Sequence, residues 1–359
     1  MNRTIRKSGI DDFQVSLMLI LTVDIMDCQN MDLTDKIDQY LINNENIRDT
    51  LSPQDVADIR LPLSNLNNGK GFRQLLLLSL VTYMELDIEP QSKEVGAIME
   101  FINILHNSSL LIDDIEDSSL ERRGEKCAYI QYGTALTLNC GTYGIFEGID
   151  SLVKYMDDEE QSEVFTDSKK YNILKKLNNE IMYLHIGQGL EIFWRDISLK
   201  VPDLFEYIKM IRLKTSGMLR ILAVLFLEFF EVHDEQKRQN IMRLMEYIGV
   251  LYQIRDDYLN IIADNSTDIH EGKFSFPVLL AINKELKDNE GKSVVYNIVT
   301  KKHKLDKDIG IVMEILKKYD VLDTTVNVIN SLIEQIIVSF DLKKESALVY
   351  LLQKIRIGN

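Results

Sequence analysis

The pattern of apolar residues along the chain predicts an almost entirely α-helical protein. Over long segments, apolar side chains recur every three or four positions, which places them on one face of a helix. One such run contains six apolar residues: Leu219, Leu222, Ala223, Phe226, Leu227 and Phe230. Short alternating runs typical of strands do not recur at regular spacing, and only five prolines interrupt the 359 residues. We therefore expect an all-α fold.

The breaks between the expected helices are short, and none is a long Gly-, Ser- or Pro-rich linker. The length and an apolar content of 45% allow a large core. We expect an N-terminal extension or helix over residues 1–50 and one all-α domain over residues 51–359. The apolar run 15–23 is too short to cross a bilayer and ends at Asp24, so we expect no integral membrane segment.

Two acidic clusters are distinctive because each follows an apolar run. They are Asp113-Asp114-Ile115-Glu116-Asp117 and Asp256-Asp257-Tyr258-Leu259-Asn260. Helix positions four apart share a face, so Asp113 would point with Asp117, and Asp256 with Asn260. One cluster alone could be a solvated, acidic helix end. Two clusters, each with an apolar run followed by acidic residues, favour two walls of one site for Mg²⁺ and diphosphate. Mg²⁺ takes one or two protein carboxylates and completes its coordination shell with water and phosphate oxygens.

The net charge of −15 argues against nucleic acid as a partner. An anionic substrate would therefore need metal ions and locally placed cations. Such cations flank the first cluster, and we expect some of them to form a second, metal-free anion pocket from Lys70, Arg73, His106 and Arg123. Alone, the Gly69-Lys70-Gly71 segment would be an ordinary basic loop, and His106 a core or cap histidine.

The three cysteines, Cys28, Cys127 and Cys140, form neither a disulfide framework nor a metal-binding spacing. Such sparse use is typical of a reducing compartment, and we expect a cytoplasmic protein.

Six segments, in this order, resemble the trans-isoprenyl diphosphate synthases of the geranylgeranyl diphosphate synthase type, most closely the fungal and animal branch. The segments are Gly69–Arg73, Leu105–Gly124, Gly187–Asp196, Lys214–Gly217, Tyr252–Asn260 and Asp268–Pro277. Each is weak alone, but all six in order are specific. The resemblance implies an all-α, single-domain helical bundle around a deep central cavity, and a homodimer or a hexamer of dimers.

The family joins an allylic diphosphate, here expected to be farnesyl diphosphate, to isopentenyl diphosphate and so makes geranylgeranyl diphosphate. The shorter dimethylallyl and geranyl transfer steps are also possible for such an enzyme. The allylic C–O bond ionises, the second substrate's alkene attacks the carbocation, and a proton is lost. About three Mg²⁺ ions per site would stabilise the departing diphosphate.

The resemblance assigns roles to individual residues. Asp113, Asp117 and Asp256 would bind the Mg²⁺ ions, and Thr215 and Gln253 would place oxygen dipoles near the carbocation. Arg122, Lys214 and Lys273 would contact the allylic diphosphate. The metal-free pocket of Lys70, Arg73, His106 and Arg123 would hold isopentenyl diphosphate.

Product length should follow from the depth of an apolar pocket below Asp113. Ser108 and Ser109, five and four positions before it, are small, which favours a product longer than farnesyl. We expect the floor of this pocket at Ile145, Phe146 and His185, although Phe146 could equally be plain core packing.

The chain departs from the family pattern at several positions. Tyr129 stands where relatives commonly have His, and Ile186 replaces a common Arg. The loop 262–267 looks short and lacks a Lys before Asp268 that helps relatives to bind diphosphate. Either diphosphate binding would then be weaker, or Lys273 would contribute more to it.

Two alternative functions remain open. A class I terpene cyclase would use the same acidic clusters, but it has no use for an isopentenyl diphosphate pocket. A synthase-like regulatory subunit, with weak or no activity of its own, would pair with a catalytic partner; the altered loop before Asp268 is the feature that supports it.

Overall fold

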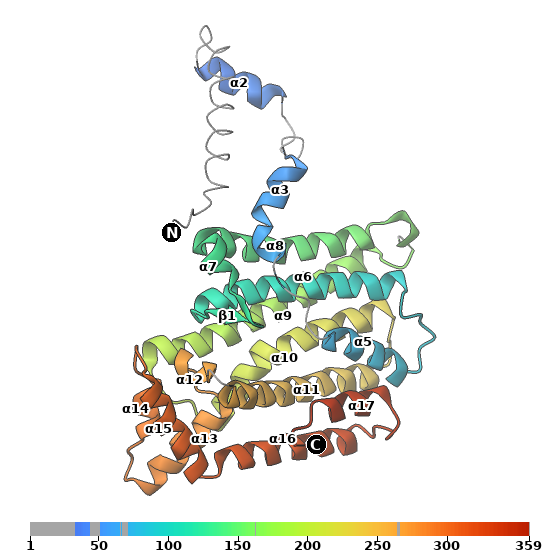
Figure 1. Ribbon diagram of the computed structural model, residues 1–359. Coiled ribbons are helices and arrows are strands. Elements are labelled where there is room, and N and C mark those ends of the chain that lie inside the picture. The colour runs from blue at the N-terminus through green and yellow to red at the C-terminus, as the bar shows by residue number, and fades with distance from the viewer. Residues whose placement is uncertain are drawn as a thin grey trace, which may run out of the picture. The chain divides into compact units, whose positions relative to one another are not determined.

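The computed structural model describes residues 33–43, 51–64, 66, 71–161, 163–263 and 266–358, and these residues are almost entirely α-helical (Figure 1). The expected all-α fold is confirmed. The chain divides into two units, Met1–Asp58 and Ile59–Asn359. In the first unit the described elements are α2 (Leu33–Asn43) and most of α3 (Pro53–Ile59). Most of the expected N-terminal extension lies outside the described residues.

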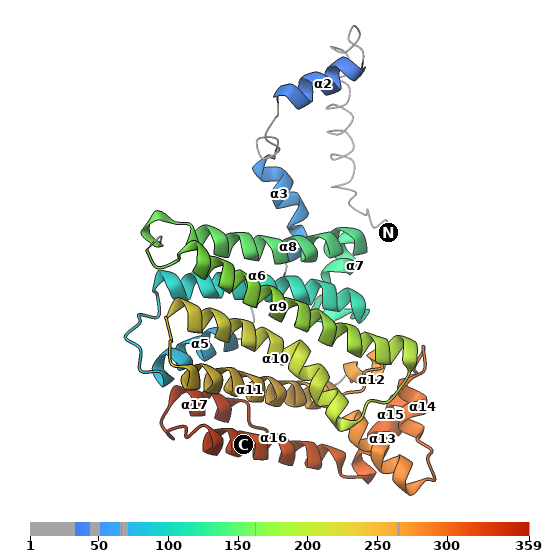
Figure 2. The ribbon, with the colours of Figure 1, turned by 180° about the vertical axis from the view of Figure 1, so that it is seen from behind.

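Long helices form the body of the second unit. They are α5 (Phe72–Tyr83), α6 (Lys93–Glu116), α8 (Thr134–Met156), α9 (Asp167–Ile192), α10 (Leu204–Phe229), α11 (Glu235–Ile262) and α16 (Val321–Ser339). Helix α6 packs against α8 and α10, α10 packs against α9 and α11, and α11 packs against α16. Figures 1 and 2 show these helices stacked side by side in layers.

Shorter elements connect and cover the long helices. They are α4 (Leu61–Ser64), β1 (Glu121–Arg122), β2 (Glu125–Lys126), α7 (Ala128–Tyr132), the 3₁₀-helix η2 (Glu159–Gln161), the π-helix η3 (Phe193–Ser198), α12 (Thr267–Glu271), α13 (Phe276–Asp288), α14 (Val294–Val299), α15 (Asp306–Lys318) and α17 (Ala347–Lys354). Strands β1 and β2 form one antiparallel pair, in which Arg122 faces Glu125. This small hairpin directly follows the first acidic cluster.

Side-chain caps fix where the long helices begin. Ser92 accepts a hydrogen bond from the Val95 N–H at the start of α6, and Asp234 accepts one from Lys237 at the start of α11. At the start of α10, Asp203 and Glu206 form a reciprocal capping box. These caps set the register in which each helix presents its site residues.

Helix α10 lies at the centre of the core. Every residue from Ser216 to Leu227 is buried, so the helix has no solvent face along this stretch. The three-to-four spacing within 219–230 had predicted a helix with one apolar face. The structure buries all faces because α5, α6, α9 and α11 contact α10 from different sides.

Glycines allow the neighbouring helices to approach α10 closely. A Cβ at Gly187 of α9 would lie 2.9 Å from the Leu213 Cβ of α10, and one at Gly249 of α11 would lie 2.6 Å from the Ser216 Cα. Both separations are shorter than a van der Waals contact. The backbone of α10 is therefore held tightly from both sides next to Lys214 and Thr215.

Length and composition alone would allow two described helices, α6 and α16, to cross a membrane. Core helices of a folded domain meet the same criterion, and α6 packs along α8 and α10. This feature is therefore weak evidence for a membrane span.

Gly187→Ala and Gly189→Ala provide a matched pair of substitutions on α9. Gly187→Ala should lower the free energy of unfolding by about 1–3 kcal/mol, because the added methyl group overlaps α10. Gly189→Ala should raise it by about 0.5–1 kcal/mol, since a Cβ there meets open space and Ala favours the helix. Urea unfolding followed by circular dichroism measures both values. Equal effects of the two substitutions would contradict the close packing of α9 on α10.

Candidate active site

The first acidic cluster lies at the C-terminal end of α6. Asp113, Asp114 and Glu116 belong to its last turns, and Asp117 is the C-cap residue, whose N–H donates to the Asp113 carbonyl at 2.8 Å. Asp113 and Asp117 are thus one helical turn apart, as the sequence predicts. Carboxylates this close repel one another and need cations around them.

Cationic and amide groups from three other elements surround Asp113. Arg122 Nη2 of β1 lies 3.0 Å from Oδ2, while Gln188 Nε2 of α9 and Lys214 Nζ of α10 lie 3.1 and 3.5 Å from Oδ1. Burial would raise the pKa of Asp113, but Lys214, Lys273 and Arg122 outweigh burial and hold this pKa below its ordinary value. Asp113 is therefore a carboxylate at neutral pH.

The two oxygens of Asp117 face different partners. Arg195 Nη1 lies 2.6 Å from Oδ1, and Lys273 Nζ lies 2.5 Å from Oδ2. Lys273 also pairs with Glu271 at 2.7 Å, and Glu271 accepts a hydrogen bond from Ser119 at 2.8 Å. These contacts connect the end of α6 to the segment that follows α12.

The second acidic cluster lies near the C-terminal end of α11 and divides between two faces. Asn260 donates to Asp256 at 3.3 Å and to Asp268 at 3.2 Å, so these three residues lie together. Asp257 points into the core, where it accepts hydrogen bonds from Tyr207, the Gln253 amide and the Phe276 N–H at 2.6 to 2.7 Å. Asp256 and Asn260 thus share one face, as expected from their spacing.

The two acidic clusters border one shared cationic space. Burial raises the pKa of Asp256, and Lys273, Arg122 and Lys214 oppose that rise. The same three cations act on Asp113. Both acidic clusters are therefore close to the same cations. Asp113 and Asp256 thus do not lie on opposite outer surfaces of the protein.

The donor set of this space fits Mg²⁺ shared with a phosphate-bearing molecule. Within the described residues, no three His, Cys, Asp or Glu side chains gather closely enough to form a metal centre on their own. Mg²⁺ does not need such a cage, because it takes one or two carboxylates and fills its shell with water and phosphate oxygens. The oxygen-only ligands Asp113, Asp117 and Asp256 match that preference.

A second group of cations lies beside the first. Arg73 is half-buried, and its Nε is buried with no hydrogen-bond partner among the described residues. Burial and the charges of Arg73, Arg123 and Arg122 lower the pKa of His106 to about 3. His106 is therefore neutral at physiological pH and can donate only one N–H. Three arginines around a neutral histidine favour an anion in this pocket. Lys70, the fourth residue expected here, lies outside the described residues.

The hairpin turn distributes adjacent arginines between the two pockets. Arg122 of β1 bonds to Asp113 and Asp114, at 3.0 and 2.5 Å. Arg123 acts on Arg73 and His106, and Arg122 has a smaller effect on His106 as well. The turn is tight, since Arg123 and Gly124 have φ angles of +56° and +82°.

Thr215 and Gln253 form a hydrogen-bonded chain with a defined direction. Gln253 Nε2 donates to Asp257 at 2.7 Å, which leaves its Oε1 to accept the Thr215 hydroxyl proton. The lone pairs of Thr215 Oγ1 are then free to face a positive centre. Asp257 determines this direction, because a carboxylate can only accept hydrogen bonds.

Three polar residues of the site received no role from the sequence: Gln188, Glu191 and Arg195. Gln188 bridges Asp113 and Glu116, and Glu191 pairs with Lys214 at 2.5 Å. Positions 188, 191 and 195 lie on one helical face, which is the signal that could have identified them.

The structure does not gather the five expected chain-length residues around one floor. Ser108 is buried where α6 meets Gly144 of α8, and Ile145 is buried, but Phe146 is 66% exposed and His185 is exposed on α9. Consecutive helix residues point about 100° apart, so Ile145 and Phe146 cannot both face inward. Ser109 is half-buried, and its hydroxyl donates to the His106 carbonyl at 2.8 Å.

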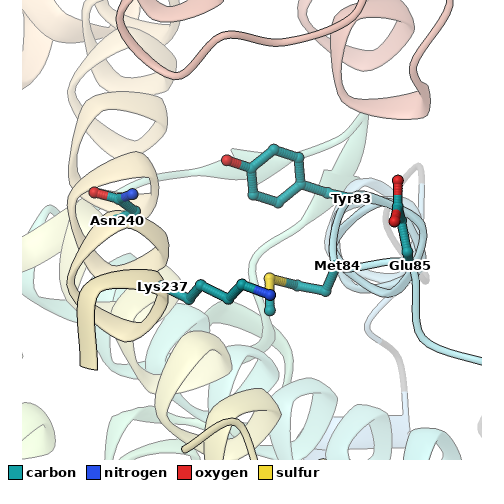
Figure 3. Close-up of a pocket in the computed structure, with 5 residues that line it drawn as sticks. All are labelled: Tyr83, Met84, Glu85, Lys237 and Asn240. Atoms are coloured by element: carbon teal, nitrogen blue, oxygen red, sulfur yellow. The ribbon is translucent and has the colours of Figure 1, made fainter. Parts of the chain in front are cut away.

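A separate surface pocket lies between the end of α5 and the start of α11. Figure 3 shows its lining residues, Tyr83, Met84, Glu85, Lys237 and Asn240. Lys237 and Asp256 are 19 residues apart on α11, which corresponds to roughly 28 Å along the helix. This pocket is therefore remote from the acidic clusters.

Comparison with known proteins gives consistent matches. Residues 60–316 match the family described as Polyprenyl synthetase. A geranylgeranyl pyrophosphate synthase of Eremothecium gossypii is 36% identical over 230 residues, 62% of this chain and 68% of that protein. Geranylgeranyl pyrophosphate synthase D of Phomopsis amygdali is 37% identical over 243 residues, which are 66% of this chain and 52% of that protein. A geranylgeranyl pyrophosphate synthase of Dictyostelium discoideum is 36% identical over 248 residues, which are 66% of this chain and 74% of that protein. The matches thus span about half to three quarters of these relatives.

The pKa of His106 generates a testable prediction for the protein without ligands. Its imidazole should stay neutral from pH 8 to pH 5, as read by ¹H–¹⁵N NMR with His106→Gln for assignment. The unfolded chain binds a proton near pH 6.5, so the neutral folded form loses stability as pH falls below about 6.5. His106→Gln should reduce that loss between pH 6.5 and 5. A His106 resonance that titrates near pH 6.5 would contradict the buried, cationic setting.

Proposed function

The chain belongs to the polyprenyl synthetase family, and from that premise we propose that it transfers a prenyl group head-to-tail from farnesyl diphosphate to isopentenyl diphosphate in a Mg²⁺-dependent reaction. The product is geranylgeranyl diphosphate. The observation that carries this proposal is the cationic space shared by Asp113 and Asp256. The names of the similar proteins, geranylgeranyl pyrophosphate synthases, support the product.

The residues of the two acidic clusters would hold the metal. Asp113 and Asp117 from α6, and Asp256 from α11, supply hard oxygen ligands from two sides. Bound Mg²⁺ stabilises the negative charge that develops on the leaving diphosphate. Glu191 and Gln188 adjoin these ligands and keep Lys214 and Asp113 in position.

Cations of this chain would bind the two diphosphates. Lys214, Lys273 and Arg122, which pair with carboxylates in the ligand-free protein, contact the allylic diphosphate. Arg73, His106 and Arg123, with Lys70, hold isopentenyl diphosphate. The buried Nε of Arg73, which has no hydrogen-bond partner in the part of the chain that the structure describes, supports an anion at that position.

The reaction then proceeds between the two bound substrates. The allylic C–O bond breaks, and its electron pair leaves with the diphosphate. The alkene of isopentenyl diphosphate attacks the allylic carbocation, and the new carbon–carbon bond forms. The resulting cation loses a proton, which the departed diphosphate accepts. Thr215 Oγ1 and the Gln253 amide oxygen direct lone pairs toward the positive charge.

Product formation tests this function directly. Purified protein with Mg²⁺, farnesyl diphosphate and labelled isopentenyl diphosphate should yield a 20-carbon prenyl diphosphate, read by mass spectrometry after dephosphorylation. Absence of any prenyl product with dimethylallyl, geranyl or farnesyl diphosphate would refute an active synthase. A hydrocarbon made from one prenyl diphosphate alone would indicate a cyclase. An inert protein that changes a partner's product would indicate a regulatory subunit.

Asp113→Ala should lower kcat/KM by about 10³-fold or more, because metal stabilisation of the leaving group is worth several kcal/mol. The matched control is Asp150→Ala on α8, whose carboxylate pairs with Lys154 on the surface. The control should retain activity within about twofold, since surface ion pairs contribute little. Steady-state kinetics at saturating Mg²⁺ measures both variants. An active Asp113→Ala enzyme would remove Asp113 from the set of metal ligands.

A further inference from the structure

Arg195 is a buried cation in the site, and the reaction described above gives it no task. It lies in the π-helix η3, directly after α9, and is only 9% exposed. A guanidinium is always charged and costs several kcal/mol to bury unless its donors are satisfied. Its partners therefore indicate why the fold retains it.

The donors of Arg195 converge on the end of α6. Nη1 donates to Asp117 Oδ1 at 2.6 Å, and Nη2 donates to the Glu116 carbonyl at 2.8 Å. Nε and Nη2 also hold the two oxygens of Asp196, at 2.8 and 2.9 Å. The Glu116 carbonyl is one of those that a helix end leaves without an intrahelical partner. Arg195 thus fixes both the last turn of α6 and the carboxylate that follows it.

The orientation of Asp117 follows from this contact. Because Arg195 occupies Oδ1, only Oδ2 remains for the cationic space, where Lys273 pairs with it in the ligand-free protein. Nη1 of a guanidinium that is itself held by the Glu116 carbonyl and by Asp196 restricts the rotation of the Asp117 carboxylate. Its second oxygen therefore faces the position at which a metal ligand is needed.

Arg195 also contacts the segment that presents Lys273. A Cβ at Gly272 would lie 3.7 Å from the Arg195 Cγ, and Gly272 adopts a φ of +82° at the turn before Lys273. The aliphatic stem of Arg195 is thus adjacent to this turn, while its guanidinium holds Asp117. One side chain sets the position of both members of the Asp117–Lys273 pair.

The π-helix explains how the side chain reaches this place. A π-turn accommodates an extra residue and re-aims the side chains that follow it, and such turns are frequent at functional sites. Residues Phe193 to Ser198 form this turn at the point where α9 passes the end of α6. Arg195 lies within this turn and contacts Asp117 from it.

We propose that Arg195 is a positioning residue for metal binding: it fixes the Asp117 carboxylate so that one defined oxygen faces the Mg²⁺–diphosphate complex. The inference rests on the proposed function. Lysine cannot replace the arginine, since it lacks the planar fork that contacts the carboxylate and the carbonyl at the same time.

The test measures metal binding and stability, both independently of turnover. Mn²⁺ replaces Mg²⁺ as an observable ion, and its affinity is read by electron paramagnetic resonance in the presence of inorganic diphosphate. Arg195→Lys should weaken Mn²⁺ binding about 10- to 100-fold, which is the usual effect of losing an outer partner of a metal ligand. The Mg²⁺ concentration for half-maximal activity should rise in parallel.

Arg220→Lys is the matched control. Arg220 is 7% exposed and, like Arg195, pairs with two carboxylates, here Glu180 and Glu246, and donates to one carbonyl, that of Arg212. Its substitution should lower the melting temperature about as much as Arg195→Lys does, with Mn²⁺ affinity unchanged within about twofold. Equal Mn²⁺ affinities for wild type and Arg195→Lys would overturn the proposal and show a purely structural role.

A double-substitution cycle with Asp117→Asn separates the remaining explanations. If Arg195 acts through Asp117, Arg195→Lys should not weaken Mn²⁺ binding further in the Asp117→Asn background. A full additional loss in that background would also overturn the proposal. If the wild-type protein binds no Mn²⁺ with diphosphate at all, the proposed function fails first, so the two failures are distinguishable.

Discussion

The compensation of buried carboxylates by shared cations is the interaction on which the rest of this structure depends. Asp113, Asp117 and Asp256 come from two helices far apart in sequence; Asp117 is buried, and Asp113 and Asp256 are half-buried. Without Lys214, Lys273 and Arg122 between them, their mutual repulsion would force the ends of α6 and α11 apart. The same cations are the groups that a diphosphate needs. The same three cations therefore stabilise the folded protein and are available to bind an anionic substrate.

The helical framework makes this arrangement possible. Helix α10 is buried on every side from Ser216 to Leu227, and Lys214 and Thr215 directly precede that stretch. Gly187 and Gly249 let the neighbouring helices approach the α10 backbone at this level. A rigid central helix therefore holds the charged residues at a fixed depth. A mobile loop would not hold a metal ligand and its opposite charge at so well defined a distance.

The sequence predicted the fold class and the two acidic helix ends because both depend on local periodicity. The three-to-four apolar spacing reports helices, and the i, i+4 spacing of Asp113 and Asp117 follows from one turn of a helix. Asp257 shows the limit of such reasoning, since it is adjacent to Asp256 and yet belongs to the core. Which of two neighbouring residues faces inward depends on packing partners distant in sequence. For the same reason Phe146 lies on an outer face and Ile145 does not.

The arginine pair in the hairpin turn between β1 and β2 has a consequence for how two substrates meet. Arg122 pairs with Asp113, while the adjacent Arg123 acts on His106, so in the proposed reaction a single peptide unit would separate the cations of the two diphosphate pockets. The left-handed conformations of Arg123 and Gly124 make the turn between the strands tight. In the proposed reaction the hairpin would therefore fix the distance between two head groups. A change in its length would alter the alignment of both reactants together.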